Sequence, residues 1–401
     1  MEQGIGQTQS AEPTTSTQLI IMQLRRQLAD LMHVEDHEVL KPPDAVIAFR
    51  GQVHGDTEAA FEHMTQRFAA YDYTAWLRDR PGGGHEVIAT KGVLERRPGR
   101  TWINVVLFLV TLFSVLYIGA SNELDPSMIE DPESLGRLIV TLTHLHLGIP
   151  FAATLMGVLL AHELSHYFVA RRYGSPVSLP FFIPLPLSLM GTMGAVIVQR
   201  APMRNRKALF DIGIAGPLGG LVVAIPLLIL GLTLSNVEPS PIVVPPNVEI
   251  FQEGNSLLYL ALKYLVFGKI LPSNGEDVWL NSAAFAAWAG LLVTMINLIP
   301  VGQLDGGHVS YALLGRRAWT FGYVAIAAMV AWGGWLTMSG NDAGGFWMTW
   351  GFLNLILNRR HPPPLDDATK LGWPRIGLGL LMLVIFILLF MPAPLRIVFV
   401  R

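Results

Sequence analysis

The chain has 401 residues, of which 51% are hydrophobic and only 14% are charged, and its formal net charge is −2 at pH 7. A soluble protein of this length carries about a quarter charged residues, so the composition excludes an ordinary soluble globular protein. No basic face for nucleic acid is found in the sequence, and the lack of cysteine excludes disulfides and thiolate metal ligands. Several apolar runs reach the roughly 20 residues that cross a lipid bilayer, which predicts a polytopic α-helical membrane protein.

Residues 1–40 are predicted to form a disordered tail and an amphipathic helix. The first part, residues 1–17, is rich in Gln, Ser and Thr and lacks the apolar stretch of a cleaved signal peptide. From Thr17 to about Leu40 the apolar residues recur at helical spacing. We interpret this stripe, which contains Ile20, Leu24, Leu28 and Leu31, as a packing face.

Residues 41–95 are predicted to form a small α/β module in the cytosol. A strand over 45–53 precedes a helix over 57–71 that starts at Asp56 or Thr57, and strands over 73–78 and 86–90 pair across a glycine turn. About 50 residues barely suffice for an independent core, so we expect the module to dock on another element. No catalytic constellation is found in it, which favours an interaction domain with a regulatory partner.

Residues 101–391 are predicted to form the membrane domain. Arginines precede the first span and acidic residues follow it, so the positive-inside rule places the N-terminus in the cytoplasm. The alternation of later loops places the C-terminus outside. About six or seven spans are expected, because the segment 345–357 is short. The predicted spans are 102–119, 150–172, 208–234, 279–299, 318–336, 345–357 and 376–391.

The second span carries the pattern His-Glu-x-x-His at His162, Glu163 and His166. Positions i and i+4 share one face of a helix, so both imidazoles can reach one metal ion, with Glu163 beside them to take a proton from water. Ionisable groups inside a bilayer cost about 2.5–3.5 kcal/mol each and need a strong partner such as zinc. On the motif alone, a proton relay or a solvated helix face is the alternative. His144 and His146, just before this span, are interpreted as interfacial, with a role near the metal left open.

The apolar segment 175–198 follows, and its four prolines exclude a regular helix. Basic residues at both ends place both ends in the cytoplasm, so we predict a re-entrant, non-helical segment that dips into the membrane and returns. Its edge could pair with a substrate unwound into a strand, and a lipid-facing cap is the alternative. The small residues of 215–220, in the third span, predict close contact between helices.

A second polar motif closes the fourth span. Asp305 is the only carboxylate in the long apolar region from Trp279 to Leu314. Pro300 and Gly302 break the helix and can turn Asp305 inward, and the arginines that follow place it near the cytoplasmic side. Two polar motifs far apart in sequence are therefore expected at the same bilayer depth. A plain turn residue is the alternative for Asp305.

With both motifs located, the sequence resembles the site-2 protease family of intramembrane zinc metalloproteases. The resemblance rests on His162-Glu-Leu-Ser-His166 in one helix and on Asn297-Leu-Ile-Pro together with Leu-Asp305-Gly-Gly in another, within a core of residues 145–315. Residues 181–186 and 191–195 further resemble the bacterial and plant chloroplast branch. The resemblance implies one Zn²⁺ ion held by His162, His166 and Asp305. It also implies Glu163 as the catalytic base and Asn297 as a catalytic residue that positions the substrate.

The resemblance further implies hydrolysis of a peptide bond in or near a transmembrane segment of a membrane-protein substrate, after an earlier cut by another protease. The chain departs from parts of the family in having no PDZ domain between the motifs and no appended cystathionine-synthase-type pair, so the N-terminal module could take the gating role. The main alternative is an intramembrane metal or proton transporter, which should show repeated halves, and no second copy of the His162 motif is found. A non-catalytic adaptor is a further alternative, which the intact Glu163 disfavours.

Overall fold

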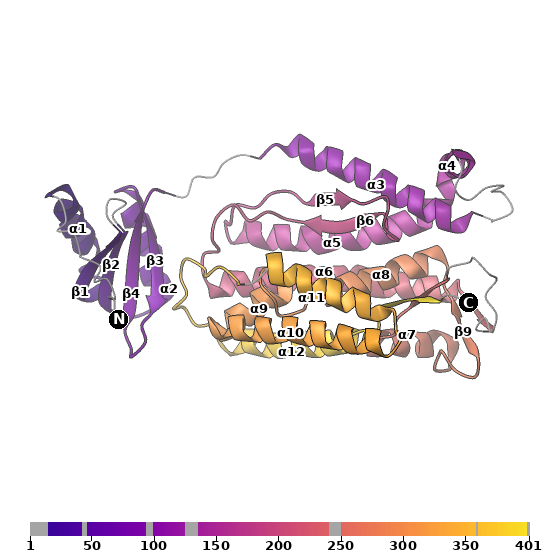
Figure 1. The fold of residues 1–401 in the computed structure, drawn as a ribbon. Coiled ribbons are helices and arrows are strands. Elements are labelled where there is room, and N and C mark those ends of the chain that lie inside the picture. The colour runs from indigo at the N-terminus through magenta and orange to yellow at the C-terminus, as the bar shows by residue number, and fades with distance from the viewer. Residues whose placement is uncertain are drawn as a thin grey trace, which may run out of the picture. The chain divides into compact units, whose positions relative to one another are not determined.

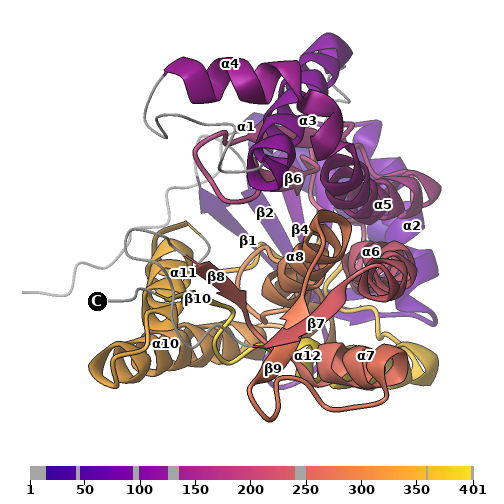
Figure 2. The same ribbon diagram turned by 90° about the vertical axis from the view of Figure 1, so that its right-hand side faces the viewer.

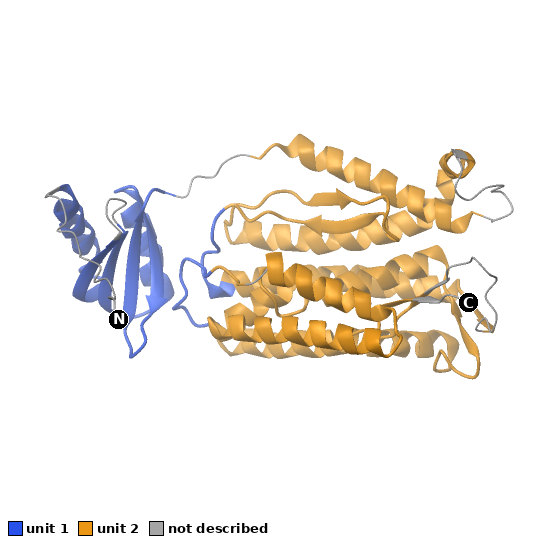
Figure 3. Ribbon diagram, in the orientation of Figure 1, with its two compact units in different colours: residues 1–97, 201–207, 363–371 blue, residues 98–200, 208–362, 372–401 orange. Residues whose placement is uncertain are grey.

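A computed structural model describes residues 15–41, 46–93, 99–124, 135–239, 250–357 and 360–398. The contacts divide the chain into two compact units (Figure 3). Unit 1 comprises residues 1–97, 201–207 and 363–371, and unit 2 comprises residues 98–200, 208–362 and 372–401. The division into 1–40, 41–95 and 101–391 concerns independent folding and stays a prediction. The predicted acidic loop around 125–134 lies outside the described residues.

Unit 1 is built on a four-stranded antiparallel sheet in the order β1-β2-β4-β3. Alternate strand residues are apolar and buried, including Ile47, Phe49 and Leu77, and they pack against two helices. Helix α2 begins at Thr57 because the Asp56 carboxylate accepts a hydrogen bond of 2.9 Å from the Ala59 amide, as its sequence predicts. The elements are α1 (Thr15–Leu28), β1 (Met32–Lys41), β2 (Val46–Val53), α2 (Thr57–Ala69), β3 (Tyr73–Asp79) and β4 (His85–Lys91).

The prediction of one helix up to about Leu40 is wrong. Helix α1 ends at Leu28, and Met32–Lys41 is a strand paired with β2. The helical stripe is real as far as Leu28, and Leu24 and Leu28 are fully buried. The sequence pattern did not predict this strand, because the register of β1 shifts between Val34 and Asp36 and again between Val39 and Lys41. Such shifts interrupt the alternation of apolar and polar residues by which a strand is recognised.

Two segments distant in sequence extend this sheet at the free edge of β3. The Leu77 amide donates to the Leu365 carbonyl and the Asp367 amide donates to the Leu77 carbonyl, each at 2.9 Å. Beyond them, the Leu365 amide donates to the Met203 carbonyl at 2.8 Å. Ala368 is buried in the same core. The edge of β3 is therefore covered by the backbone of 365–367, whose other side pairs with 203–205.

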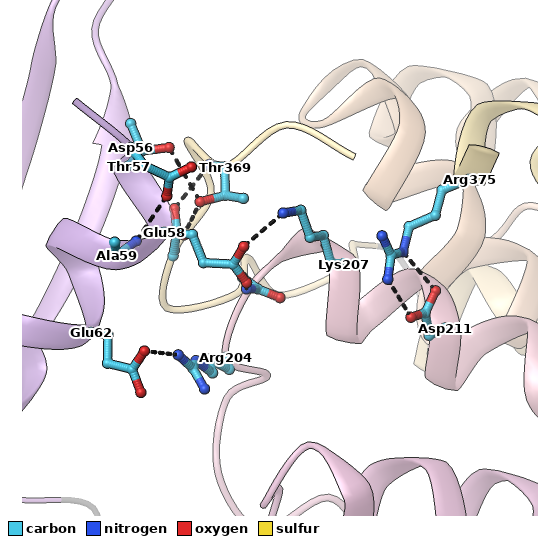
Figure 4. Close-up of polar contacts among 12 residues, drawn as sticks. Asp56, Thr57, Glu58, Ala59, Glu62, Arg204, Lys207, Asp211, Thr369 and Arg375 are labelled. Carbon is cyan, nitrogen blue, oxygen red and sulfur yellow. Dashed lines mark hydrogen bonds and ion pairs between the residues drawn. The ribbon is translucent and has the colours of Figure 1, made fainter. Parts of the chain in front are cut away.

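Acidic side chains on the first turns of α2 also hold the 201–207 segment (Figure 4). Glu58 accepts from Asn205 Nδ2 at 2.8 Å and pairs with Lys207 Nζ at 2.6 Å. Glu62 lies 3.2 Å from Arg204 Nη2. Backbone pairing and charge together tie 204–207 to the N-terminal sheet and helix.

Unit 2 is a helical bundle (Figure 1). Four stretches are long and apolar enough to cross a membrane: α3 (Thr101–Glu123), Leu145–Arg172, α6 (Arg206–Thr233) and α10 (Arg317–Met338). Leu145–Arg172 consists of the short 3-10 turn η2 (Leu145–Gly148) and α5 (Ile149–Arg172). The predicted mostly helical architecture, with several helices that could cross a membrane, is therefore confirmed. The remaining helices are α4 (Leu135–Thr143), α7 (Leu257–Phe267), α8 (Ser282–Asn297), α9 (Asp305–Leu314), α11 (Ala343–Leu357) and α12 (Trp373–Leu389).

Three predicted spans are shorter than a full crossing. Helices α8, α11 and α12 have 16, 15 and 17 residues, against the roughly 20 that span a bilayer. Helix α8 lies at the centre of the unit, seen from one end in Figure 2, and most of its residues are buried. Two small strand pairs lie in the same unit: β7 (Asn236–Pro239) with β9 (Glu276–Trp279), and β8 (Ile250–Glu253) with β10 (Leu395–Val398).

The proline-rich segment after α5 is not helical, as predicted. It forms a hairpin of β5 (Phe181–Pro184) and β6 (Thr192–Val196) beside α3 and α5 (Figure 1). Asn104 of α3 donates to the Leu179 carbonyl at 2.8 Å, and Ser114 donates to the Gly191 carbonyl at 2.6 Å. Asn104 and Ser114 are ten residues apart on α3, a distance of about 15 Å along the helix axis. The hairpin therefore accompanies α3 over about half of a bilayer thickness.

Candidate metal centre

Helix α5 brings the two motif histidines together on one face. His162 and His166 are 3% and 5% exposed, and their Nε2 atoms are 3.2 Å apart. One helical turn separates the residues, so their side chains stack along the axis as the i, i+4 spacing predicts. Glu163, the next residue after His162, is also buried.

The break after α8 delivers the carboxylate. Helix α8 ends at Asn297, and α9 begins at Asp305, so the chain turns over seven irregular residues that include Pro300 and Gly302. Asp305 Oδ2 lies 3.0 Å from His162 Nε2, and Asp305 Oδ1 lies 3.1 Å from His166 Nε2. The two sequence motifs, more than 130 residues apart, thus meet at one buried point. Asp305 is not a plain turn residue.

These three side chains fit a metal ion. His166 Nδ1 donates to the Ile212 carbonyl at 2.6 Å, which leaves the lone pair of Nε2 in the neutral ring facing Asp305 and His162. Two imidazole nitrogens and a carboxylate that are buried together, away from water, are stabilised by a cation between them. In a tetrahedral zinc site, ligand atoms lie about 3.3 Å apart, close to the separations seen here. In the described part of the chain, the histidines and Asp305 form the one such group, with all ligand atoms within 4.8 Å.

Two further predicted residues border the group. The backbone amide of Ile197, directly after β6, donates to the Glu163 carboxylate. Asn297, the last residue of α8, places Nδ2 3.4 Å from His162 Nε2. Neither His144 nor His146 belongs to the group. His144 Nδ1 instead lies 2.9 Å from the Val140 carbonyl, one turn earlier in the chain.

Glycines of α6 let that helix lie directly against the histidine face of α5. A methyl group at Gly216 would overlap the His166 ring, and one at Gly219 would overlap the Ser165 hydroxyl. The predicted close helix contact of 215–220 is therefore confirmed, and it is made with α5, the helix that carries His162 and His166. The Ile212 carbonyl that orients His166 was missed by sequence reasoning, because any residue supplies such a backbone acceptor.

This packing predicts that Gly216→Ala lowers zinc affinity by at least about tenfold, the scale of lost ligand orientation. Alanine is the better helix former, so helix propensity does not explain a loss. Gly157→Ala is the matched control, because a methyl group at Gly157 on α5 meets no atom within 4 Å. Zinc titration of both purified variants checks the prediction, and equal affinities would contradict the packing.

Comparison with known proteins agrees with this geometry. The model of peptidase family M50 matches residues 150–338. The chain is 28% identical over 381 residues to the probable zinc metalloprotease EGY1, chloroplastic, of Arabidopsis thaliana, covering 85% of this chain and 66% of the relative. It is 27% identical over 372 residues to the probable zinc metalloprotease EGY2, chloroplastic, of Oryza sativa subsp. indica, covering 88% of this chain and 63% of the relative. The chain thus spans slightly less than two thirds of the length of these curated relatives.

Proposed function

We propose that this chain, whose residues 150–338 match the model of peptidase family M50, is a member of that family and an intramembrane zinc metalloprotease. The observation that carries the proposal is the meeting of two imidazoles from one apolar helix with a carboxylate from a distant helix, all buried. A group with two nitrogens and one carboxylate oxygen leaves a fourth zinc position open, as catalytic zinc sites require. The substrates are membrane proteins, cut in or near a transmembrane segment in regulated intramembrane proteolysis.

His162, His166 and Asp305 would hold the zinc ion, and Ile212 keeps His166 in the tautomer that presents Nε2. Zinc bound there supplies Lewis-acid chemistry, which activates water and polarises the scissile carbonyl. Glu163 acts as general base toward the attacking water and then as general acid toward the leaving amine. The Ile197 amide holds the Glu163 carboxylate in place.

The hairpin is our candidate for binding the substrate backbone. A helical peptide hides its carbonyls in its own hydrogen bonds, so the substrate must unwind before cleavage. Ile197, directly after β6, lies beside Glu163, while Val196 and Val198 are 47% and 46% exposed. A substrate added to the hairpin as a further strand would satisfy its freed backbone groups and lie near the base.

Asn297 is proposed to donate a hydrogen bond to the substrate carbonyl as negative charge develops on it. Asn297→Leu is then expected to lower kcat by about 10²–10³-fold, as loss of one oxyanion donor does elsewhere. Zinc affinity should change little, because the Asn297 amide is not a zinc ligand. Single-turnover cleavage measures the rate and zinc titration measures the affinity. A loss of zinc affinity as large as the loss of rate would mean that Asn297 supports His162 instead of binding the substrate carbonyl.

The finer topology is part of the proposal: six or seven spans, a re-entrant hairpin, a cytosolic N-terminal module with a regulatory partner, and a C-terminus outside. Helices α3 and α12 run in the same direction within unit 2 (Figure 1), which supports opposite sides for the start of α3 and the end of α12. Asn104 and Ser114 of α3 donate hydrogen bonds to two backbone carbonyls of the hairpin segment, so these carbonyls do not need water as a partner. This supports a buried position of the hairpin beside the spans.

Reconstitution in liposomes tests the function against the transporter alternative. We expect the purified protein with zinc to cleave a co-reconstituted transmembrane reporter, and to leave a zinc-sensitive dye inside the vesicles unchanged. Zinc flux without any cleavage would overturn the proposal.

A further inference from the structure

His361 is a buried histidine that no part of the proposed chemistry uses. It lies between α11 and α12, is 4% exposed, and its ring stacks on Tyr311 with centroids 4.8 Å apart. Its Nε2 is 2.6 Å from Nδ1 of His308. Its carbonyl accepts a hydrogen bond of 3.0 Å from Trp319 Nε1. Burial lowers the pKa of His361 to about 3, so the ring is neutral at physiological pH.

The partners of His361 place it against the helix that supplies the metal ligand. His308 and Tyr311 belong to α9, whose first residue is Asp305. His361 also lines a small cavity with Pro300, Gly302 and Gly307, around the break that turns Asp305 inward. A side chain packed on both the break and the first turns of α9 limits the directions in which Asp305 can point.

The chain that follows His361 is built into unit 1. Arg78 Nη1 donates to the Pro364 carbonyl at 2.6 Å and to the Leu365 carbonyl at 3.0 Å. Residues 365–367 then pair with β3, as described above. We call residues 360–371 the strap. Only two residues, 362 and 363, separate its contact with α9 at His361 from its contact with the N-terminal sheet at Pro364.

The second segment held by the N-terminal module leads to the other ligand helix. Glu58 holds Lys207, and α6 begins at Arg206. Five residues after Lys207, the Ile212 carbonyl accepts the hydrogen bond from His166. Both chain segments gripped by the module therefore continue, within a few residues, into groups that orient a metal ligand.

We propose that His361 is a positioning residue for Asp305, and that the strap couples the N-terminal module to the metal centre. The inference rests on the proposed zinc site. A partner that binds the module and shifts β3 would act on Asp305 through 364–367 and His361. The module thereby takes a regulatory role without any catalytic residue of its own.

The test measures zinc affinity and amide hydrogen exchange on the full chain in detergent micelles. His361→Ala is expected to weaken zinc binding by about 10–100-fold, the range for residues that orient metal ligands. It should also speed exchange of α9 amides in metal-free protein, while α3 amides keep their protection. His361→Gln, which can keep a donor toward His308, should recover part of the affinity and serves if the alanine variant does not fold.

The far end of the strap is tested by Arg78→Ala, with Arg50→Ala as the matched control. Arg50 makes ion pairs on the same sheet with Asp36, Glu38 and Glu86, and all three acids lie outside the strap. Arg78→Ala should weaken zinc binding and loosen α9, Arg50→Ala should do neither, and the loss in Arg78→Ala with His361→Ala should be less than additive.

Each result decides the inference. Unchanged zinc affinity and α9 exchange in both His361 variants would overturn the positioning role, and equal effects of Arg78→Ala and Arg50→Ala would overturn the coupling. A wild-type protein without zinc affinity would overturn the proposed function. In that case α9 exchange in the same metal-free variants still decides whether His361 holds the helix.

Discussion

Glu163→Gln is expected to lower the rate of substrate cleavage by about 10²–10⁴-fold, the usual contribution of a general base, while zinc stays bound. The glutamine amide has the shape of the carboxylate but cannot take a proton from water. Glu163 is buried beside the three proposed ligands and is not one of them, so its replacement should leave the donor set intact. Cleavage of a reconstituted transmembrane reporter and metal analysis of the same preparation measure the two quantities.

The role of Glu163 as general base requires that the variant loses cleavage activity but keeps its zinc. A variant that lost zinc together with activity would make Glu163 a ligand or a structural support. A Glu163→Gln protein that cuts at the wild-type rate would show that another group takes the proton. Glu163→Asp is a useful companion, because it keeps the carboxylate but withdraws it by one methylene, and it should retain part of the activity.

Asp305→Ala should have the largest effect on metal binding, with zinc affinity lowered by more than about 100-fold and cleavage abolished. Residues that only orient ligands already contribute about 10–100-fold, and Asp305 is proposed as a ligand itself. The substitution also leaves both imidazoles without their carboxylate partner at 3.0 and 3.1 Å. Isothermal titration with zinc, after chelation and dialysis, gives the affinity.

Asp342→Ala is the matched control, since Asp342 is an exposed carboxylate just before α11. It should bind zinc as the wild type does. If Asp305→Ala retained wild-type affinity, the proximity of Asp305 to the histidines would reflect a hydrogen-bonded cluster and not a metal site.

The elements that determine the site were predictable because they are local or simple in composition. The His-Glu-x-x-His spacing aligns His162 and His166 on any helix, and the apolar run around the motif predicts a helix there. Pro300 and Gly302 mark the break before Asp305 by their own backbone restrictions. The four closely spaced prolines of 175–186 likewise disfavour a regular helix, because each lacks an amide donor and restricts the residue before it.

The features that were missed depend on long-range pairing. The strand Met32–Lys41 is identified by β2, and its shifted register hides the alternation. Segments 203–205 and 365–367 join the sheet of unit 1 through backbone hydrogen bonds. Because every residue has these backbone groups, no side-chain pattern in the sequence predicts such pairing. His361 is a single histidine before a run of prolines, and only its packing against Tyr311 and His308 marks it. Span lengths also differed, since α8 is short and buried by its neighbours rather than by lipid.

X-ray absorption spectroscopy at the zinc edge, on wild-type protein and Asp305→Ala, tests the shared ligand set most directly. We expect one zinc per wild-type chain, with two imidazole nitrogens and one carboxylate oxygen at about 2.0–2.2 Å, and a site that is empty or has lost its carboxylate in the variant. A wild-type chain that takes up no zinc when supplied with it, or one whose zinc spectrum is the same in Asp305→Ala, would contradict the account.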